Sequence, residues 1–188
     1  IEKAFEYEKQ IRQNALNPQI SINISTETFM DLNFIENFKS IMDKHQTNPQ
    51  NITIEIIEQV CLYDIDIARN RINNLRNLGF KIAIDDFGTG YSNLSYLSDL
   101  EVDFIKIDRK FILDLNKEKG KKVLRDIINI SHSMGCKVIV EGIENESQLQ
   151  LIKIFGADFA QGFYFHKPNT FNKIIEYTPL IIWKKNKK

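Results

Sequence analysis

Residues with the chemistry of a polar site recur at the ends of short apolar runs. Five of the six runs carry, at or near the C-terminal end, a residue type that apolar cores avoid: Asn23, Glu55, Asp85 with Asp86, Lys106 with Asp108, and Glu141. Gln161 lies within the sixth run. Charged groups are rarely buried without partners, so this regularity indicates a functional site rather than a core. For any one carboxylate taken alone, a salt bridge or a helix cap is the alternative.

The set is strongly acidic, which favours a bound divalent cation. Five carboxylates accompany one lysine and would repel one another in a low-dielectric site. Oxygen ligands with one amide fit Mg²⁺, Mn²⁺ or Ca²⁺ and argue against Zn²⁺. The adjacent Asp85 and Asp86 suit a two-metal site, which activates water and clamps a phosphodiester during in-line attack.

Lys106 has two readings that the sequence leaves equally open. It is a candidate general base, because nearby metal ions would favour its neutral form. It is equally a plain counter-charge to Asp108 or Asp86. Lys106 and Asp108 lie two residues apart on one run, so we expect both side chains on one face of a strand.

The apolar runs themselves predict the strands that position these residues. Each has about the length of one strand, and most are too continuously apolar for a sheet with one wet face. The six runs are Ile20–Ser25, Ile52–Ile57, Lys81–Asp85, Phe104–Asp108, Lys137–Val140 and Phe159–Phe165.

Amphipathic segments alternate with the runs and predict helices. The pattern covers Ile1–Leu16, Asp66–Leu78 and Val123–Met134, and Asn145 with Gln148 resembles a capping pair before a further helix. Six β-α units in 188 residues compare with eight in about 250 for a closed barrel. The fold class predicted is therefore α/β, about six units of a TIM-like (β/α)₈ barrel. An open doubly wound sheet is the alternative, but its glycine-rich phosphate loop after the first strand is missing.

Composition narrows the class of protein. Lys plus Arg and Asp plus Glu both number 25, so the basic excess of a general DNA- or RNA-binding surface is lacking. We expect one domain over residues 1–180 and a basic, solvated tail over 181–188. No stretch has the composition of a membrane span or a signal peptide. Cys61 and Cys136 lack metal spacing and are expected to be buried thiols in a cytoplasmic domain, while a membrane anchor elsewhere in a longer parent stays open.

The same residues resemble those of EAL domains, the bacterial cyclic di-GMP phosphodiesterases. The matching segments run in family order over nearly the whole chain: INIS at 22–25, IEIIE at 54–58, DDFGTGYSNLSYL at 85–97, VDFIKIDRKFI at 102–112, VEGIENESQ at 140–148 and GADFAQGFYFHKP at 156–168.

The resemblance implies a (β/α)₈-like barrel that hydrolyses the second messenger cyclic di-GMP to linear pGpG with Mg²⁺ or Mn²⁺, two ions per site. It assigns metal ligation to Asn23, Glu55, Asp85, Asp86 and Asp108. The resemblance implies catalytic roles for Lys106, Glu141 and Asp86, and it implies that Gln161 contacts the substrate. It also implies that Glu58, Gly88 and Gly90 support the loop after Asp86. A homodimer through the loop and helix after Asp86, over Tyr91–Leu100, is a further implication.

The chain also departs from the family. The strand that carries Glu-Ala-Leu lies upstream of what the chain contains, and with it a metal-binding Glu and a substrate-holding Arg. Ile57 replaces a Thr whose hydroxyl supports the loop. Glu101 occupies a position where the family usually has Pro, and Val140 one where it usually has Ala. We therefore expect the 188 residues alone to be a poor hydrolase, with exposed sheet edges that invite pairing between chains.

Two other functions compete with hydrolysis of cyclic di-GMP. A degenerate EAL domain would bind the nucleotide or a protein without turnover. A lysine-base, Mg²⁺-assisted proton-abstraction enzyme of the enolase kind is a third reading. The tandem Asp85-Asp86 followed by FGTG makes that third reading the weakest.

Overall fold

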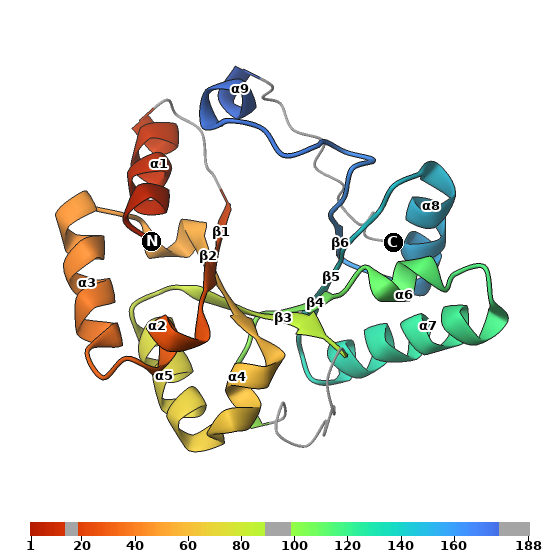
Figure 1. The fold of residues 1–188 in the computed structure, drawn as a ribbon, viewed down its shortest axis with the longest axis horizontal. Helices are drawn as coiled ribbons and strands as arrows, with labels where there is room; N and C mark the ends of the chain where they lie inside the picture. Colours follow the sequence, from red (N-terminus) through yellow and green to blue (C-terminus); the bar gives the residue numbers. More distant parts are fainter. Residues whose placement is uncertain (14–18, 89–98, 177–188) are drawn as a thin grey trace. The chain divides into compact units, whose positions relative to one another are not determined.

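The structure is a computed structural model that describes residues 1–13, 19–88 and 99–176. Its strands alternate with helices along the chain, as the sequence predicts (Figure 1). The strands are β1 (Ile20–Ile24), β2 (Ile52–Ile57), β3 (Lys81–Phe87), β4 (Phe104–Ile107), β5 (Lys137–Val140) and β6 (Phe159–Ala160). The helices are α1 (Glu2–Gln13), α2 (Thr26–Met30), α3 (Phe34–His45), α4 (Glu58–Tyr63), α5 (Ile65–Asn77), α6 (Lys110–Leu113), α7 (Glu118–Ser133), α8 (Glu146–Phe155) and α9 (Phe171–Glu176), with a 3-10 turn at Pro49–Asn51.

The order of the strands decides between the two predicted architectures. They follow one another in the sheet as β1-β2-β3-β4-β5-β6, and the pairs β1–β2, β4–β5 and β5–β6 are parallel. A doubly wound sheet reverses its strand order at a switch point, whereas a (β/α)₈ barrel keeps sequence order. The fold is therefore a partial TIM-like (β/α)₈ fold with six β-α units, and the open-sheet alternative is wrong.

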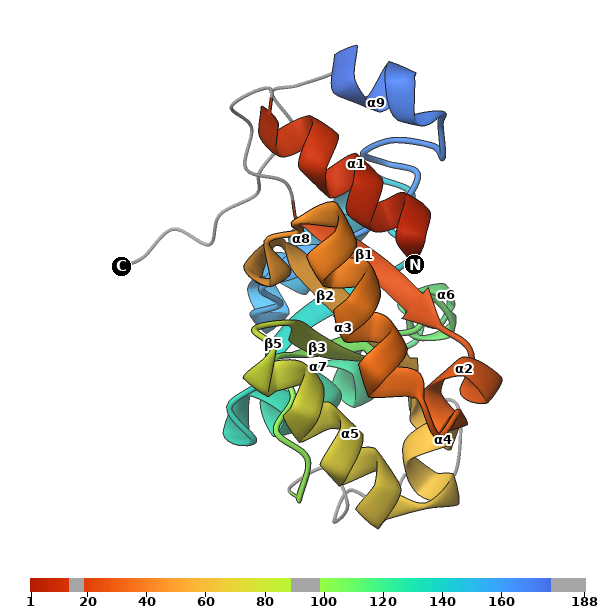
Figure 2. The ribbon, with the colours of Figure 1, turned by 90° about the vertical axis from the view of Figure 1, so that its left-hand side faces the viewer.

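Contacts divide the chain into two compact units, and each is described by itself. Of the described residues, the N-terminal unit takes 1–84 and 99–102, and the C-terminal unit takes 85–88 and 103–176. Figures 1 and 2 show α3 beside α1 within the N-terminal unit. Three rings pack at the centre of this helical layer, with Phe38 edge-on to Phe5 at 5.4 Å and to Phe80 at 5.2 Å between ring centroids.

In the C-terminal unit, α7 lies beside α6 and α8 (Figure 1). Leu124 and Ile128 of α7 and Ile152 of α8 are wholly buried, as is Val138 of β5. The predicted capping pair begins α8: the Asn145 side chain accepts from the Gln148 N–H at 3.0 Å, and the Gln148 side chain accepts from the Asn145 N–H. Local sequence thus fixes where the helix after β5 begins.

Some predicted boundaries were wrong. The last apolar run is a strand only over Phe159–Ala160, because the chain then turns: the Phe165 N–H donates to the Gly162 carbonyl. The helix predicted at Val123 begins earlier, at Glu118, in a polar first turn without apolar periodicity. The first helix ends at Gln13, and the rest of that predicted segment, to Leu16, lies outside the described residues.

Other predictions lie partly or wholly outside the described residues. They include Gly90, most of the proposed dimer segment Tyr91–Leu100, and the tail at 181–188. Both cysteines are free and buried, as predicted. Among the helices of the described chain, not one combines the length and apolar character needed to cross a membrane.

Candidate metal and catalytic site

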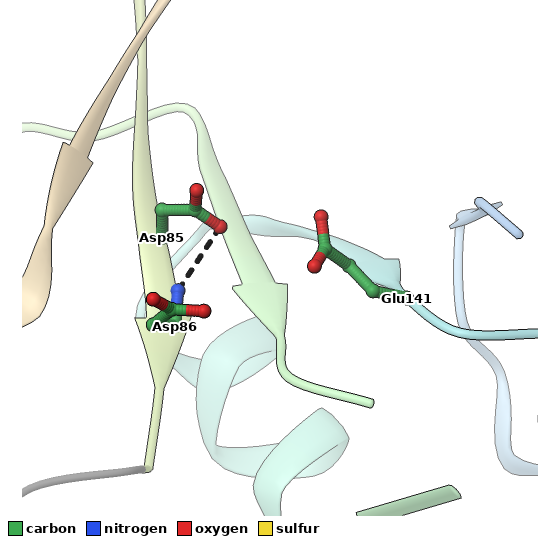
Figure 3. Close-up of side chains that lie close together, drawn as sticks. All are labelled: Asp85, Asp86 and Glu141. Carbon is green, nitrogen blue, oxygen red and sulfur yellow. Dashed lines mark hydrogen bonds between the residues drawn. The ribbon is translucent and has the colours of Figure 1, made fainter. Parts of the chain in front are cut away.

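The C-terminal unit gathers four of the predicted site residues at the ends of three neighbouring strands. Asp85 and Asp86 lie on β3, Lys106 lies on β4, and Glu141 directly follows β5. Figure 3 shows the carboxylates of Asp85 and Glu141 turned toward each other, with Asp86 below Asp85. The consecutive strand order brings these ends together, because the carboxyl ends of parallel strands meet at one edge of a sheet.

Lys106 is the charge centre of this group. Its Nζ lies 2.9 Å from Asp85 Oδ1 and 2.7 Å from Glu141 Oε1, and its side chain is only 5% exposed. A buried ammonium needs such partners, and each carboxylate needs it in return. As a counter-charge, then, Lys106 pairs with Asp85 and Glu141, whereas the sequence reading named Asp108 or Asp86.

An unusual backbone conformation brings the two adjacent aspartates together. Neighbouring residues of a regular strand point to opposite faces, which would separate Asp85 from Asp86. Asp86 instead has a φ of 55°, in the left-handed region, and its N–H donates to Asp85 Oδ1 at 3.0 Å (Figure 3). As a result, oxygens of Asp85, Asp86 and Glu141 lie within 4.8 Å of one another.

Asp86 experiences the repulsion expected of an acidic cluster. Partial burial raises the pKa of its carboxyl, and the charges of Asp85 and Asp108 raise it further. The nearby cations Lys106 and Lys110 oppose this shift. Asp108 is therefore close enough to act on Asp86 electrostatically. Its own carboxylate accepts from the Lys110 N–H at 2.8 Å, just beyond the end of β4.

The chemistry of the three clustered carboxylates shows which metal ion would fit among them. Three carboxylates from two strand ends offer only oxygen, the ligand type of Mg²⁺ and Mn²⁺. A cation among them would also relieve the repulsion that raises the pKa of Asp86. Asp85, Asp86 and Glu141 therefore fit a divalent cation, and they are a subset of the residues that the sequence singled out.

The N-terminal unit holds three further predicted residues. Asn23 of β1 pairs in register with Glu55 of β2, so these two side chains lie at one level and on one face. Glu55 is 4% exposed, and Asn23 is exposed. Glu58 opens α4 and is wholly buried. Their metal-binding and loop-supporting roles stay predictions.

The remaining predicted residues are placed as follows. Gln161 is exposed just after β6, where its N–H donates to the Val140 carbonyl and its carbonyl accepts from Ile143. Gly88 follows β3 with a φ of +81°, a conformation that favours glycine. Substrate contact by Gln161 and loop support by Gly88 stay predictions.

Sequence reasoning missed one residue beside this site. Lys110, the first residue of α6, donates from Nζ to the Gly88 carbonyl at 2.5 Å and influences the pKa of Asp86. A lysine at a helix start carries no distinctive pattern. The contact joins the residue after β3 to the helix after β4, two places that lie far apart in the sequence.

Comparison with known proteins agrees with the fold and with the residue pattern. The family model described as EAL domain matches residues 1–168. Cyclic di-GMP phosphodiesterase PdeA of Borreliella burgdorferi is 35% identical over 170 residues, which cover 89% of this chain and 25% of that protein. Probable cyclic di-GMP phosphodiesterase PdeG of Escherichia coli is 33% identical over 158 residues, 84% of this chain and 31% of that protein.

A solved structure shows the same relationship. The EAL enzyme Bd1971, in its form with cAMP and cyclic di-GMP bound, superimposes with a TM-score of 0.87 at 35% identity. The match covers 93% of this chain and 49% of that one, so the chain spans about half of that enzyme and a smaller share of the two relatives. On sequence, strand order and fold together, the chain belongs to the EAL domain family.

Proposed function

We propose that this chain carries the greater part of a site that hydrolyses cyclic di-GMP to linear pGpG with two divalent cations, Mg²⁺ or Mn²⁺. The observation that carries the proposal is the convergence of Asp85, Asp86 and Glu141 beside Lys106. The phosphodiesterase names of PdeA and PdeG support the same activity.

The ligand set proposed for the metal ions follows the residues that the resemblance assigns. Asp85 and Asp86 would hold cations, with Asp108 beside them, and Asn23 and Glu55 are the further ligands that the resemblance to the family assigns. Bound there, the ions would activate water and neutralise the phosphodiester. Without cations, the carboxylates would repel an anionic phosphate ester.

The remaining roles belong to the chain's own side chains. Lys106 Nζ, fixed by Asp85 and Glu141, would orient the attacking water or accept its proton. Glu141 would complete the water network, and Gln161 would contact the substrate. Glu58, Gly88 and Gly90 would support the loop that follows Asp86.

The test is hydrolysis of cyclic di-GMP by the full-length gene product with Mg²⁺ or Mn²⁺. We expect pGpG from the wild type and none from Glu55→Gln or Asp85→Asn. Glu118→Gln is the matched control, because Glu118 is an exposed residue at the start of α7 that pairs with Lys121 of the same helix, and it should leave the rate unchanged. A folded, Mn²⁺-loaded wild type without turnover would contradict the proposal.

The 188 residues tested alone form a second arm of that experiment. The resemblance puts a metal-binding Glu and a substrate-holding Arg on the Glu-Ala-Leu strand, so this chain by itself should hydrolyse slowly. A monomeric 188-residue chain with the full rate would show that this strand is dispensable.

A second candidate function is binding of cyclic di-GMP without turnover. It is favoured by Ile57, which ends β2 where the family has a Thr that supports the loop. Under this reading the wild type binds cyclic di-GMP but releases no pGpG, and Ile57→Thr restores measurable hydrolysis. Equal rates for the wild type and Ile57→Thr would remove the reason for this candidate.

A further inference from the structure

The exit of β3 is fixed by a side chain from α6. Gly88 is the first residue after β3, and its carbonyl accepts a hydrogen bond from Lys110 Nζ at 2.5 Å. The backbone of Lys110 is itself anchored, because its N–H donates to Asp108 Oδ1 at 2.8 Å. The lysine therefore links the end of β3 to the turn that follows β4.

An aromatic ring fills the space that a side chain at Gly88 would take. A Cβ at this position would meet Phe111 Cζ at 2.8 Å, so Gly88 lies directly on the ring of Phe111. Lys110 Nζ lies 5.0 Å from the centroid of the same ring, within the range of a cation–π contact. Two consecutive residues of α6 thus lie against Gly88, one hydrogen-bonded to its carbonyl and one at the place where a Cβ would stand.

This hold acts on a short and strained stretch of backbone. Two residues upstream of Gly88, Asp86 adopts the left-handed conformation that keeps its carboxylate near Asp85 and Glu141. For a residue with a Cβ, that conformation costs free energy and persists where the surroundings impose it. The Asp86 N–H is tied to Asp85 Oδ1, and the Gly88 carbonyl is tied to Lys110. The segment is therefore restrained on both sides of the Asp86 side chain.

We propose that Lys110 is a positioning residue for the metal site, which holds the Gly88 carbonyl so that Asp86 keeps its place beside Asp85 and Glu141. The proposal rests on the proposed function in one respect, namely that these carboxylates bind a divalent cation. Lys110 itself needs no contact with the metal ion or the substrate. Its charge also opposes the repulsion at Asp86, in the same direction as the geometric role.

The test compares Lys110→Met with Lys110→Arg in the full-length protein. Met keeps an unbranched side chain against Phe111 but cannot donate to Gly88, whereas Arg keeps a charged donor. The matched control is Lys117→Met, because Lys117 is a highly exposed lysine that pairs with the exposed Asp114. Each protein is titrated with Mn²⁺ by calorimetry, and hydrogen exchange is followed over residues 85–88 in EDTA.

Lys110→Met should weaken Mn²⁺ binding about tenfold, the low end of the effect of removing an outer-shell partner. Exchange at 85–88 should accelerate in EDTA, and Lys110→Arg should restore most of both. In steady-state kinetics, kcat and the Mn²⁺ requirement should change while KM for cyclic di-GMP stays constant. Lys117→Met should behave as wild type in every measurement.

Three results would overturn the proposal: unchanged Mn²⁺ affinity in Lys110→Met, an equal loss in Lys117→Met, or a loss that only follows reduced global stability and that Arg does not restore. If the wild type itself bound no Mn²⁺, the proposed function would fail. Hydrogen exchange in EDTA would then still show whether Lys110 restrains residues 85–88. Failure of the proposed function and failure of the positioning role of Lys110 are therefore distinguishable.

Discussion

Lys106 Nζ lies 2.7 Å from Glu141 Oε1, and the same ammonium contacts Asp85 at 2.9 Å. Both contacts are shielded from solvent, since the exposed fractions are 5% for Lys106, 20% for Glu141 and 13% for Asp85. One ammonium therefore balances two of the three carboxylates that together fit a divalent cation. The ammonium and a divalent cation would neutralise the same pair of groups.

Replacing Lys106 by Met should therefore make stability depend on metal. In EDTA, Lys106→Met removes the ammonium that pairs with two shielded carboxylates and should lower the free energy of unfolding by about 3 kcal/mol. With saturating Mn²⁺ most of this loss should disappear, because the metal ion replaces the ammonium. Urea unfolding with and without Mn²⁺ measures both values.

The control for that experiment is Lys121→Met, which removes a lysine whose partner Glu118 is exposed. It should change stability by no more than about 0.5 kcal/mol. If Lys106→Met lost the same free energy in EDTA and in Mn²⁺, the ammonium and the metal ion would not share these carboxylates.

The left-handed conformation of Asp86 predicts an order among its substitutions. Asn tolerates a φ of 55°, Gly adopts it freely, and a β-branched residue is strongly disfavoured there. Asp86→Val should therefore unfold at lower urea than Asp86→Asn, with a difference of about 1–2 kcal/mol in EDTA. Equal stability of the two variants would show that the backbone relaxes at this position.

The charge of Asp86 adds a second expectation for the same pair. Its pKa is raised, so the ionised carboxyl opposes folding above its ordinary pKa of 3.8, and protonation relieves this as pH falls. Asp86→Asn should therefore be at least as stable as wild type in EDTA at neutral pH, although it binds Mn²⁺ less well.

Alkaline pH should expose the burial of Cys61. Burial raises the pKa of this thiol from 9.0 to about 12, and the charge of Glu58 adds to the shift. Between these two values the unfolded chain loses the thiol proton while the folded chain keeps it, so stability falls as pH rises. Urea midpoints from pH 8 to 10.5 should decline more steeply for wild type than for Cys61→Ala.

Thiol labelling gives an independent measurement of the same burial. Cys61 should react with a disulfide reagent at pH 8 only at the rate of unfolding, and at once in urea. Fast labelling of the native protein at Cys61 would contradict a neutral, buried thiol.

The cap of α8 offers a local test of the fold. Asn145→Ala removes the acceptor for the Gln148 N–H and should lower the free energy of unfolding by about 1 kcal/mol. Gln150→Ala, on the exposed side of the same helix, should stay within about 0.5 kcal/mol of wild type. A smaller effect at Asn145 than at Gln150 would mean that water caps this helix equally well.

The strands were predictable because strands that are buried on both faces consist mostly of apolar residues. Ile52–Ile57 is apolar at nearly every position, and the structure makes that whole range β2. The predicted end of the last strand was wrong because apolar residues continue past the sheet. Phe163 and Tyr164 are exposed in a turn. An aromatic residue in a turn and one in a strand look alike when the sequence is read alone.

The sequence predicted which residues lie close together better than it predicted their contacts. Strand-end polar residues identified Asp85, Lys106 and Glu141 correctly as neighbours. The sequence could not show that Asp86 turns out of the strand pattern toward them, because that depends on one backbone angle. The contact between Lys110 and Gly88 could not be predicted either, because it joins two separate turns.

The left-handed backbone at Asp86 also has an evolutionary consequence. A single base change turns an aspartate codon into one for asparagine or glycine, and both of these residues accept this conformation. Mutations at this codon would therefore remove a proposed metal ligand while the fold survives. Under the proposed function, one base change would separate a hydrolase from a protein that keeps the fold without the metal ligand of Asp86.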